Sequence, residues 1–350
     1  MIFEFRGTAS ELAHADQGKL SHAITELLVA HRKGRHFCII PRVTSTWLLA
    51  NVALNPRDLA TLKRLASEFT TTAGLLNSAE QFVSIQIGHR SGVKITSNAL
   101  IVGLDDIQGE YFFDQAAFVV EDQETDGRLY SAIVHACRSK IGAPHVSLDV
   151  RHGGGERSKN VLLKLAREQR ICVLVTDSDR RLPQQGLPAK VLSYRRAVAE
   201  SGWHFAWVDC IPCREIENLV PIEVVEGLPC GVARADHLVS LKKLATSEEG
   251  AGIPADARFW CFYDLKKGVD LVQLEKVAPD SIRDWTIAKM ALSPCSYEGI
   301  SETLVPQLLN HKKQLAAFLS LVRKPEWWNC FGRVISMLMW IGFAPAAQRT

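Results

Sequence analysis

The spacing of hydrophobic residues along the chain indicates which segments form helices and which form strands. Apolar residues recur every three or four positions in residues 10–31 and 56–69, the spacing of a helix that is buried on one face. Residues 82–87 alternate apolar and polar side chains, which is typical of a half-buried strand, and residues 36–40 also have strand-like composition. This pattern predicts an α+β N-terminal region, residues 1–114, to which the sequence assigns no role.

Short apolar runs alternate with helical patterns in the middle third of the chain. This alternation implies a mainly parallel sheet that is covered by helices. The predicted elements are, in chain order, a strand at 116–120, a helix at 129–138, a strand at 145–150, a helix at 161–167, and strands at 171–175 and 205–208. We therefore expect residues 115–225 to form an α/β domain.

The last third is predicted to be a mostly helical C-terminal module, residues 226–350. Helical periodicity covers residues 301–322 and 327–341, and Pro325 separates the two segments. The apolar stretch 334–347 is too short to span a bilayer, which needs about 20 apolar residues. We expect it to be a buried helix.

Composition and charge narrow the function less than the hydrophobic pattern does. The 350 residues are 47% hydrophobic and 23% charged, which is ordinary for a globular protein of two or three domains. The formal net charge is only +3, so contacts with nucleic acid would have to come from local patches. Nine cysteines without regular spacing, and an N-terminus without a signal-peptide pattern, predict a cytoplasmic protein with no membrane contact.

Acidic residues follow two of the predicted strands of the middle third. Glu121 comes directly after the strand at 116–120, and Asp177 and Asp179 follow the strand at 171–175. Side chains two positions apart on an extended chain point the same way, so both aspartates can face one site. Because ligands of parallel α/β sheets bind outside the carboxyl ends of the strands, we expect these acids to converge there.

A cluster of carboxylates at a sheet edge is costly unless a cation neutralises it. Hard cations such as Mg²⁺ prefer carboxylate oxygens, and one or two of them can activate water and stabilise the leaving oxygen in phosphodiester cleavage. Glu217, after the strand at 205–208, is positioned in the sequence to complete a second metal position. The expected cofactor is Mg²⁺ or Mn²⁺.

These motifs, taken in order, resemble the Toprim domain, and most closely that of OLD-like antiphage nucleases. The resemblance covers about residues 115–222 and depends on four elements: Glu121 with Asp126, the run Gly153-Gly154-Gly155, the pair Asp177-Ser178-Asp179, and Arg214-Glu215-Ile216-Glu217-Asn218. In that family the glutamate and the aspartate pair bind metal, and the glutamate assists acid/base chemistry. The last element marks the nuclease branch of the family.

The resemblance implies roles for particular residues. Glu121, Asp177, Asp179 and Glu217 are the expected catalytic metal ligands, and Glu215 and Asp126 are further candidates. Asp122 departs from the family pattern, because it stands where the family often has glycine, and Asp126 lies one residue farther from Glu121 than is typical.

Other residues could contact the substrate, but each has a structural alternative. Gly153 and Gly154 could bring backbone amides to a phosphate, or they could form an ordinary turn between a strand and a helix. Arg180 and Arg181 could hold a nucleic-acid backbone, or they could balance the neighbouring aspartates.

Two more motifs are more readily explained by structure than by ligand binding. The pair Cys210 and Cys213 has the spacing of a zinc knuckle but no second close pair. Trp327 and Trp328, beside basic residues, could stack on bases, although buried tryptophans next to a solvated helix face are more common.

The function expected from these observations is that of a metal-dependent endonuclease that cleaves DNA or RNA, including transfer RNA. The resemblance suggests a prokaryotic antiphage effector that acts with a separate ATPase sensor, since the chain has no Gly-x₄-Gly-Lys-Ser/Thr loop of its own. Assembly into a homo-oligomer is left open. The alternative is a catalytically silent Toprim-like scaffold that docks a partner ATPase.

Overall fold

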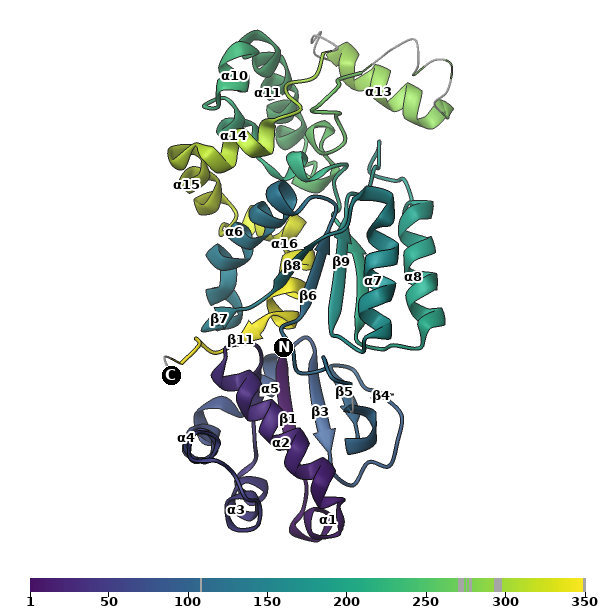
Figure 1. Ribbon diagram of the computed structural model, residues 1–350. Helices are drawn as coiled ribbons and strands as arrows, with labels where there is room; N and C mark the ends of the chain where they lie inside the picture. The colour runs from purple at the N-terminus through teal and green to yellow at the C-terminus, as the bar shows by residue number, and fades with distance from the viewer. Residues whose placement is uncertain (108, 270–273, 275, 277–278, 293–297, 349–350) are drawn as a thin grey trace.

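The computed structural model describes residues 1–350 except 108, 270–273, 275, 277–278, 293–297 and 349–350. Figure 1 shows two β-sheets stacked end to end, with a group of helices beyond the second sheet. The N-terminal third forms the first sheet, the middle third forms the second, and the last third supplies most of the helices at the far end. The chain therefore has the α/β architecture with mainly parallel sheets that the sequence predicts.

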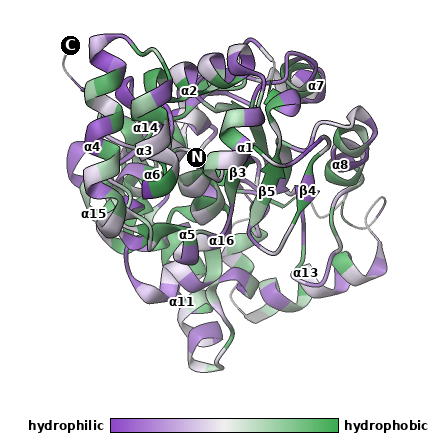
Figure 2. Cartoon of the chain, turned by 90° about the horizontal axis from the view of Figure 1, so that it is seen from below, coloured by the Kyte–Doolittle hydropathy of each residue, from purple (hydrophilic) through white to green (hydrophobic). Residues whose placement is uncertain are grey.

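The N-terminal sheet has the strand order β2-β1-β3-β5-β4. Its pairs are parallel except β4 with β5. The strands are β1 (Ile2–Arg6), β2 (Phe37–Ile39), β3 (Phe82–Gln86), β4 (Lys94–Ile95) and β5 (Ala99–Val102). The accompanying helices are α1 (Ala9–His14), α2 (Gln17–Arg32), α3 (Arg42–Asn51), α4 (Pro56–Thr72) and α5 (Leu75–Ser78). Figure 2 shows the hydrophobic colour concentrated on strands such as β5, inside the layer of helices.

Two expectations for this region are corrected. The region is α/β rather than α+β, because β1 pairs in parallel with both β2 and β3, and parallel neighbours require crossover connections that here are helical. The helix predicted at residues 10–31 is two helices. Asp16 begins the second by accepting a hydrogen bond from the Lys19 backbone N–H at 3.0 Å.

The central sheet consists of four parallel strands in the order β10-β9-β6-β8. They are β6 (Ala117–Val120), β8 (Asp149–His152), β9 (Cys172–Thr176) and β10 (Ala206–Cys210). The helices α7 (Ser158–Arg167) and α8 (Ala189–Ser201) cover one face, and α6 (Arg128–Cys137) lies on the other (Figure 1). The single strand predicted at 145–150 is two short strands, β7 (His145–Val146) and β8, that join different sheets.

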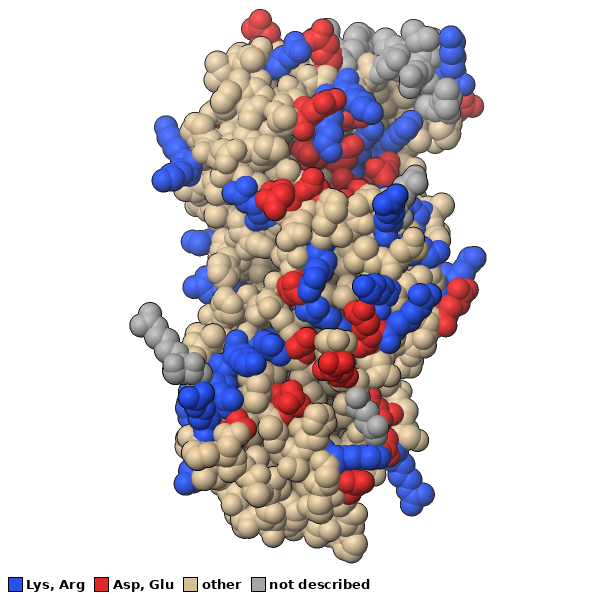
Figure 3. Space-filling view, viewed as in Figure 1, with Lys and Arg blue, Asp and Glu red and all other residues tan. Residues whose placement is uncertain are grey.

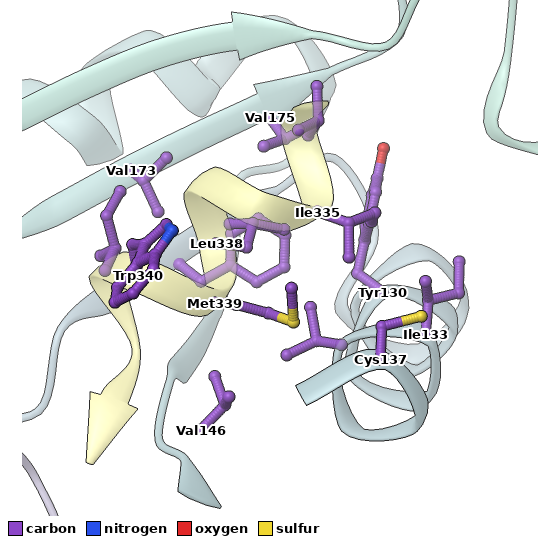
Figure 4. Close-up of a cluster of buried hydrophobic side chains, with 14 of the residues drawn as sticks. Tyr130, Ile133, Cys137, Val146, Val173, Val175, Ile335, Leu338, Met339 and Trp340 are labelled. Atoms are coloured by element: carbon purple, nitrogen blue, oxygen red, sulfur yellow. The ribbon is translucent and has the colours of Figure 1, made fainter. Parts of the chain in front are cut away.

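The C-terminal third is mostly helical, but its last helix returns to the central sheet. Its helices are α9 (Ile222–Val225), α10 (Pro229–Ala233), α11 (Ala235–Gly250), α13 (Asp280–Leu292), α14 (Leu304–Asn310), α15 (Lys312–Leu321) and α16 (Pro325–Ile341). Figure 4 shows Ile335, Leu338 and Met339 of α16 between Val173 of β9 and Ile133 of α6. All five side chains are buried.

The buried helix predicted at 334–347 ends at Ile341. Residues Phe343–Ala344 form β11, which pairs antiparallel with β7 and so ties the end of the chain to the central domain. The helical segment predicted at 301–322 is likewise divided, into α14 and α15, at His311. Among the described residues, none of the helices combines the length and the apolar character needed to cross a membrane.

Candidate active site

Three of the predicted acids meet at the carboxyl end of the central sheet. Strands β6 and β9 are parallel neighbours with Val119 opposite Leu174, so the residues that follow them emerge at the same edge. Glu121 follows β6 and accepts a hydrogen bond from the Thr176 hydroxyl at the end of β9. Figure 3 shows acidic and basic side chains gathered on the surface at this level, between the central sheet and the helices beyond it.

A lysine links Glu121 to the aspartate pair. Lys190, in the first turn of α8, donates a hydrogen bond to Glu121, and its ammonium lies 3.8 Å from Asp179 Oδ2. Burial alone would lower the pKa of Lys190, but the hydrogen bond and charge of Glu121 and the charge of Asp179 outweigh burial and raise it. Lys190 therefore stays charged and partly neutralises the two carboxylates.

The segment after β9 is fastened to the loop after β10. Asp179 adopts a left-handed backbone conformation (φ 52°), which aspartate tolerates better than most residues. Its N–H donates to the Arg214 carbonyl at 2.9 Å, and the Ser178 hydroxyl donates to the Cys213 carbonyl at 2.6 Å. Asp177 Oδ1 accepts from the Ile216 N–H at 3.0 Å. These bonds bring the third acidic element of the sequence to the same edge of the sheet.

That element places two glutamates around a second lysine. Lys266 Nζ lies 3.2 Å from Glu217 Oε1 and 3.4 Å from Glu215 Oε2. Glu217 is 4% exposed, and the Oε2 atoms of both glutamates are buried without a hydrogen-bond partner among the described residues. The short helix η5 (Ile216–Leu219) holds Glu217 through a capping bond between Asn218 and the Glu215 backbone at 2.9 Å.

The electrostatics of the cluster are dominated by excess negative charge. Burial raises the pKa of Asp177 well above its usual range, and the charges of Glu217, Glu121 and Asp126 raise it further, while Lys266 only partly opposes them. Burial also raises the pKa of Glu217, against the attraction of Lys266. Without another cation, the cluster is therefore stabilised by binding protons.

Asp126 joins the cluster through an unusual helical turn. Residues Gln123–Gly127 form a π-helical turn, η2, in which the Gly127 N–H donates to the Asp122 carbonyl five residues earlier at 3.0 Å. A π turn holds one residue more than an α turn. Asp122 caps the turn by accepting hydrogen bonds from the N–H groups of Glu124 at 2.7 Å and Thr125 at 3.2 Å.

The glycine run positions Glu121 from the other side. Gly153 donates its N–H to the Val120 carbonyl at 2.7 Å, and Gly154 donates to the Glu121 carbonyl at 3.2 Å. A Cβ at Gly153 would come within 2.7 Å of the Val120 carbonyl oxygen, so only glycine fits there. Both amides are engaged in this turn, and a phosphate would have to share them. Their predicted contact with substrate stays a prediction.

Arg180 and Arg181 lie beside the acids but face different surroundings. The Arg180 guanidinium lies over the ring of Phe262, 5.8 Å from its centroid, and donates to the Pro183 carbonyl at 3.3 Å. Arg181 is exposed at the edge of a neighbouring cavity. The described contacts therefore hold Arg180 in place and leave the Arg181 side chain directed to solvent.

Two other motifs from the sequence are engaged in the protein interior. Burial raises the pKa of the Cys213 thiol well above its usual range, and this thiol donates to the Glu215 carbonyl at 3.5 Å. Trp327 is buried, and its indole N–H donates to the Leu219 carbonyl at 3.1 Å. Both side chains support the loop that carries Glu217.

The donor atoms of the cluster suit a hard divalent cation, although the side chains are not arranged around a cation position in this structure. Among the described residues, no group of three or more His, Cys, Asp or Glu is arranged to hold a metal ion. The ammonium groups of Lys190 and Lys266 instead lie against the carboxylates. The oxygen-only donor set, the two glutamate oxygens that accept no hydrogen bond from the described residues and the raised pKa of Asp177 nevertheless match the chemistry that Mg²⁺ or Mn²⁺ requires.

Sequence reasoning identified the acids but missed both lysines. Lys190 is the second residue of α8, after a proline-containing loop, and Lys266 lies 49 positions after Glu217 with no motif around it. Neither position shows a pattern that indicates a site. A scan against protein-family models and searches of the curated proteins and of the solved structures each found no match to this chain.

Proposed function

We propose that this protein is a Mg²⁺- or Mn²⁺-dependent endonuclease with a Toprim-like catalytic domain. The observation that carries the proposal is the meeting of Glu121, Asp177 and Asp179 at the carboxyl edge of the central sheet, with Glu217 fastened to the same edge. These carboxylates come from three separate strand ends. An arrangement that gathers negative charge in this way costs stability, and cation-dependent chemistry is a reason to maintain it.

The chain's own residues have distinct tasks in this proposal. Glu121, Asp177, Asp179 and Glu217 would hold the cation, with Glu215 and Asp126 next to them. A bound Mg²⁺ or Mn²⁺ supplies charge stabilisation to the phosphodiester oxygens and makes water a better nucleophile at neutral pH. Lys190 and Lys266 neutralise part of the cluster when no cation is bound. The Gly153 and Gly154 amides and the π turn hold Glu121 and Asp126 in position.

The biological setting that we propose rests on the family resemblance alone. It is that of a cytoplasmic prokaryotic antiphage effector that works with a separate ATPase. Its substrate would be DNA or RNA, including transfer RNA, because carboxylate-bound metals cleave both polymers.

Cleavage assays with isosteric variants test the activity. The purified protein is incubated with plasmid, single-stranded DNA and total RNA, with Mg²⁺ or Mn²⁺, beside Glu121→Gln and Asp177→Asn. We expect both variants to lose at least about 100-fold in rate, since each removes a charged ligand while preserving volume. Glu124→Gln is the matched control, because Glu124 is exposed in the same turn. Unchanged cleavage in both variants would remove the proposed site.

The second candidate is a catalytically silent scaffold that docks a partner ATPase. The observation that favours it is the position of Lys190 and Lys266, whose ammonium groups already lie against the carboxylates. Calorimetric titration with Mn²⁺ separates the two candidates. A nuclease binds Mn²⁺ through the cluster and loses this binding in Asp177→Asn, whereas a silent scaffold shows neither metal binding nor cleavage.

A further inference from the structure

The cavity that Arg181 lines lies beside the acidic cluster, between the central domain and the C-terminal helices. Its volume is about 370 Å³, near the lower end of the range for small-ligand sites, which is about 300–1,000 Å³. Four aromatic residues contribute to its wall: Phe259, Phe262, Tyr263 and Trp285. The Trp285 ring lies 5.4 Å from that of Phe259, tilted, and 5.9 Å from that of Phe262, edge to face. Phe259 and Phe262 are buried, whereas Trp285 is partly exposed, so Trp285 is the flat apolar surface that the cavity offers to a ligand of limited size.

Cationic side chains stand at the same cavity. Arg181 and Lys267 line it and are exposed, so their charges remain available to a ligand at the entrance. Arg214 also lines it, but its guanidinium is paired with Asp264 and Glu215, so the charge available to a ligand comes from Arg181 and Lys267. This combination of aromatic surface and positive charge is typical of proteins that stack unpaired bases and contact the backbone beside them.

Short connections join the cavity to the carboxylates. Arg214 Nε lies 3.7 Å from Glu215 Oε1, and its Nη2 lies 2.6 Å from Asp264 Oδ2, which lines the cavity. Lys267 follows Lys266, the lysine that bridges Glu215 and Glu217. A chain of two residues spans at most about 7 Å, so Arg181 stays close to Asp179. A nucleotide seated in the cavity would have its phosphate next to the acidic cluster.

We infer that this cavity receives one unstacked nucleobase of the substrate, and that the enzyme therefore acts on single-stranded nucleic acid or on unpaired loops. The inference rests on the proposed function, since it names the substrate of the same site. A base inside a duplex is stacked on both faces and enters such a cavity only after it has been flipped out, which costs free energy. An unpaired base bears no such cost, and every base has a flat face to stack.

Binding measurements without divalent metal test the inference apart from cleavage. Fluorescence anisotropy in EDTA compares short DNA and RNA single strands, the corresponding duplex, and a fully abasic strand of the same length. The tighter of the DNA and RNA strands identifies the polymer that supplies the base. We expect it to bind the parent protein about 5- to 150-fold more tightly than the abasic strand does, the range for stacking one base. Equal binding of the base-bearing and abasic strands would overturn the inference.

Two variants locate the binding. Trp285→Leu should weaken single-strand binding within the same range and leave abasic binding unchanged, and Lys267→Glu should weaken both. Lys243→Glu is the control, because it makes the same charge change at an exposed lysine on α11. At the same salt concentration it should weaken binding only slightly, and less than Lys267→Glu does. Lys267→Glu lies on the surface, so its result stands even if Trp285→Leu folds poorly. Unchanged binding in Lys267→Glu and in folded Trp285→Leu would overturn the inference.

The outcomes separate this inference from the proposed function. Metal-dependent cleavage that is lost in Glu121→Gln, together with equal binding of duplex and single strand, would leave the nuclease standing and remove the base-binding cavity. Base-dependent binding without any cleavage would support the base-binding cavity and remove the proposed nuclease activity.

Discussion

Removal of the Lys266 charge is the sharpest test of the electrostatic picture of the cluster. Lys266 is the cation closest to the buried Glu217, at 3.2 Å, and it also lies 3.4 Å from Glu215. Lys266→Met keeps most of the side-chain length and removes only the ammonium group. The variant leaves Glu217, which is almost fully buried, without its counter-ion, and leaves Glu215 paired with Arg214 alone.

The expected magnitude follows from the geometry. At an effective dielectric constant of about 20, two charges 3.2 Å apart attract by about 5 kcal/mol. A third of the Lys266 side chain is exposed, so solvent screening reduces this value. Glu217 also takes up a proton once its counter-ion is gone, which limits the cost further. We expect a loss of about 2–3 kcal/mol at about pH 8, somewhat less than removal of one partner from a fully buried pair.

The loss depends on pH with a definite sign. The pKa of Glu217 is already raised in the folded protein, so its proton is held more tightly there than in the unfolded chain. This contribution favours the folded state at low pH and is lost as pH rises through the raised pKa. Because Lys266→Met raises that pKa further, the deficit of the variant should be largest at neutral to alkaline pH and should shrink towards pH 5.

Thermal unfolding followed by circular dichroism measures the effect. An unfolding entropy of about 2.1 cal/mol/K per residue, taken over the whole chain, converts 2–3 kcal/mol into a decrease in Tm of about 3–4 °C. Lys243→Met, at an exposed position of α11, is the control and should leave Tm unchanged. Equal shifts in the two variants, or a deficit in Lys266→Met that is the same at pH 5 and pH 8, would refute the reasoning.

Three further variants test other parts of the structure. Asp177→Asn should raise Tm by a few degrees in metal-free protein at pH 8, since it removes a buried charge while its Oδ1 can still accept a hydrogen bond. Because the pKa of Asp177 is raised in the folded protein, this gain should shrink towards pH 5 and vanish only below the ordinary aspartate pKa of 3.8. Thermal unfolding at pH 8 and pH 5 would show this, and a lower Tm at pH 8 would count against it. Gly153→Ala should cost about 1–3 kcal/mol in urea unfolding, because a Cβ would press on the Val120 carbonyl, and a neutral result would mean that the turn relaxes freely. Asp58→Ala should cost about 3–5 kcal/mol by the same measurement, because it leaves the largely buried Arg32 without its counter-ion. A loss below about 1 kcal/mol would contradict this.

The sequence by itself determined the central sheet and the acids at its edge. Buried parallel strands need continuous apolar runs, so β6 and β9 were visible, and an acid directly after such a run has to emerge at the carboxyl edge. Glu121, Asp177 and Asp179 could therefore be predicted from local pattern alone. The spacing of Glu215 and Glu217 was also visible in the sequence. The hydrogen bonds that fasten their loop to the segment after β9 were not.

Only the tertiary structure decided how the cluster is neutralised and supported. Lys190 and Lys266 reach the carboxylates from elements that are distant in sequence, and no local periodicity marks a residue whose partner is set by chain folding. The return of α16 to the central sheet and the parallel pairing of β1 with β3 are likewise long-range contacts. Local pattern determines which face of a segment is buried, whereas the segment that it meets depends on how the whole chain packs.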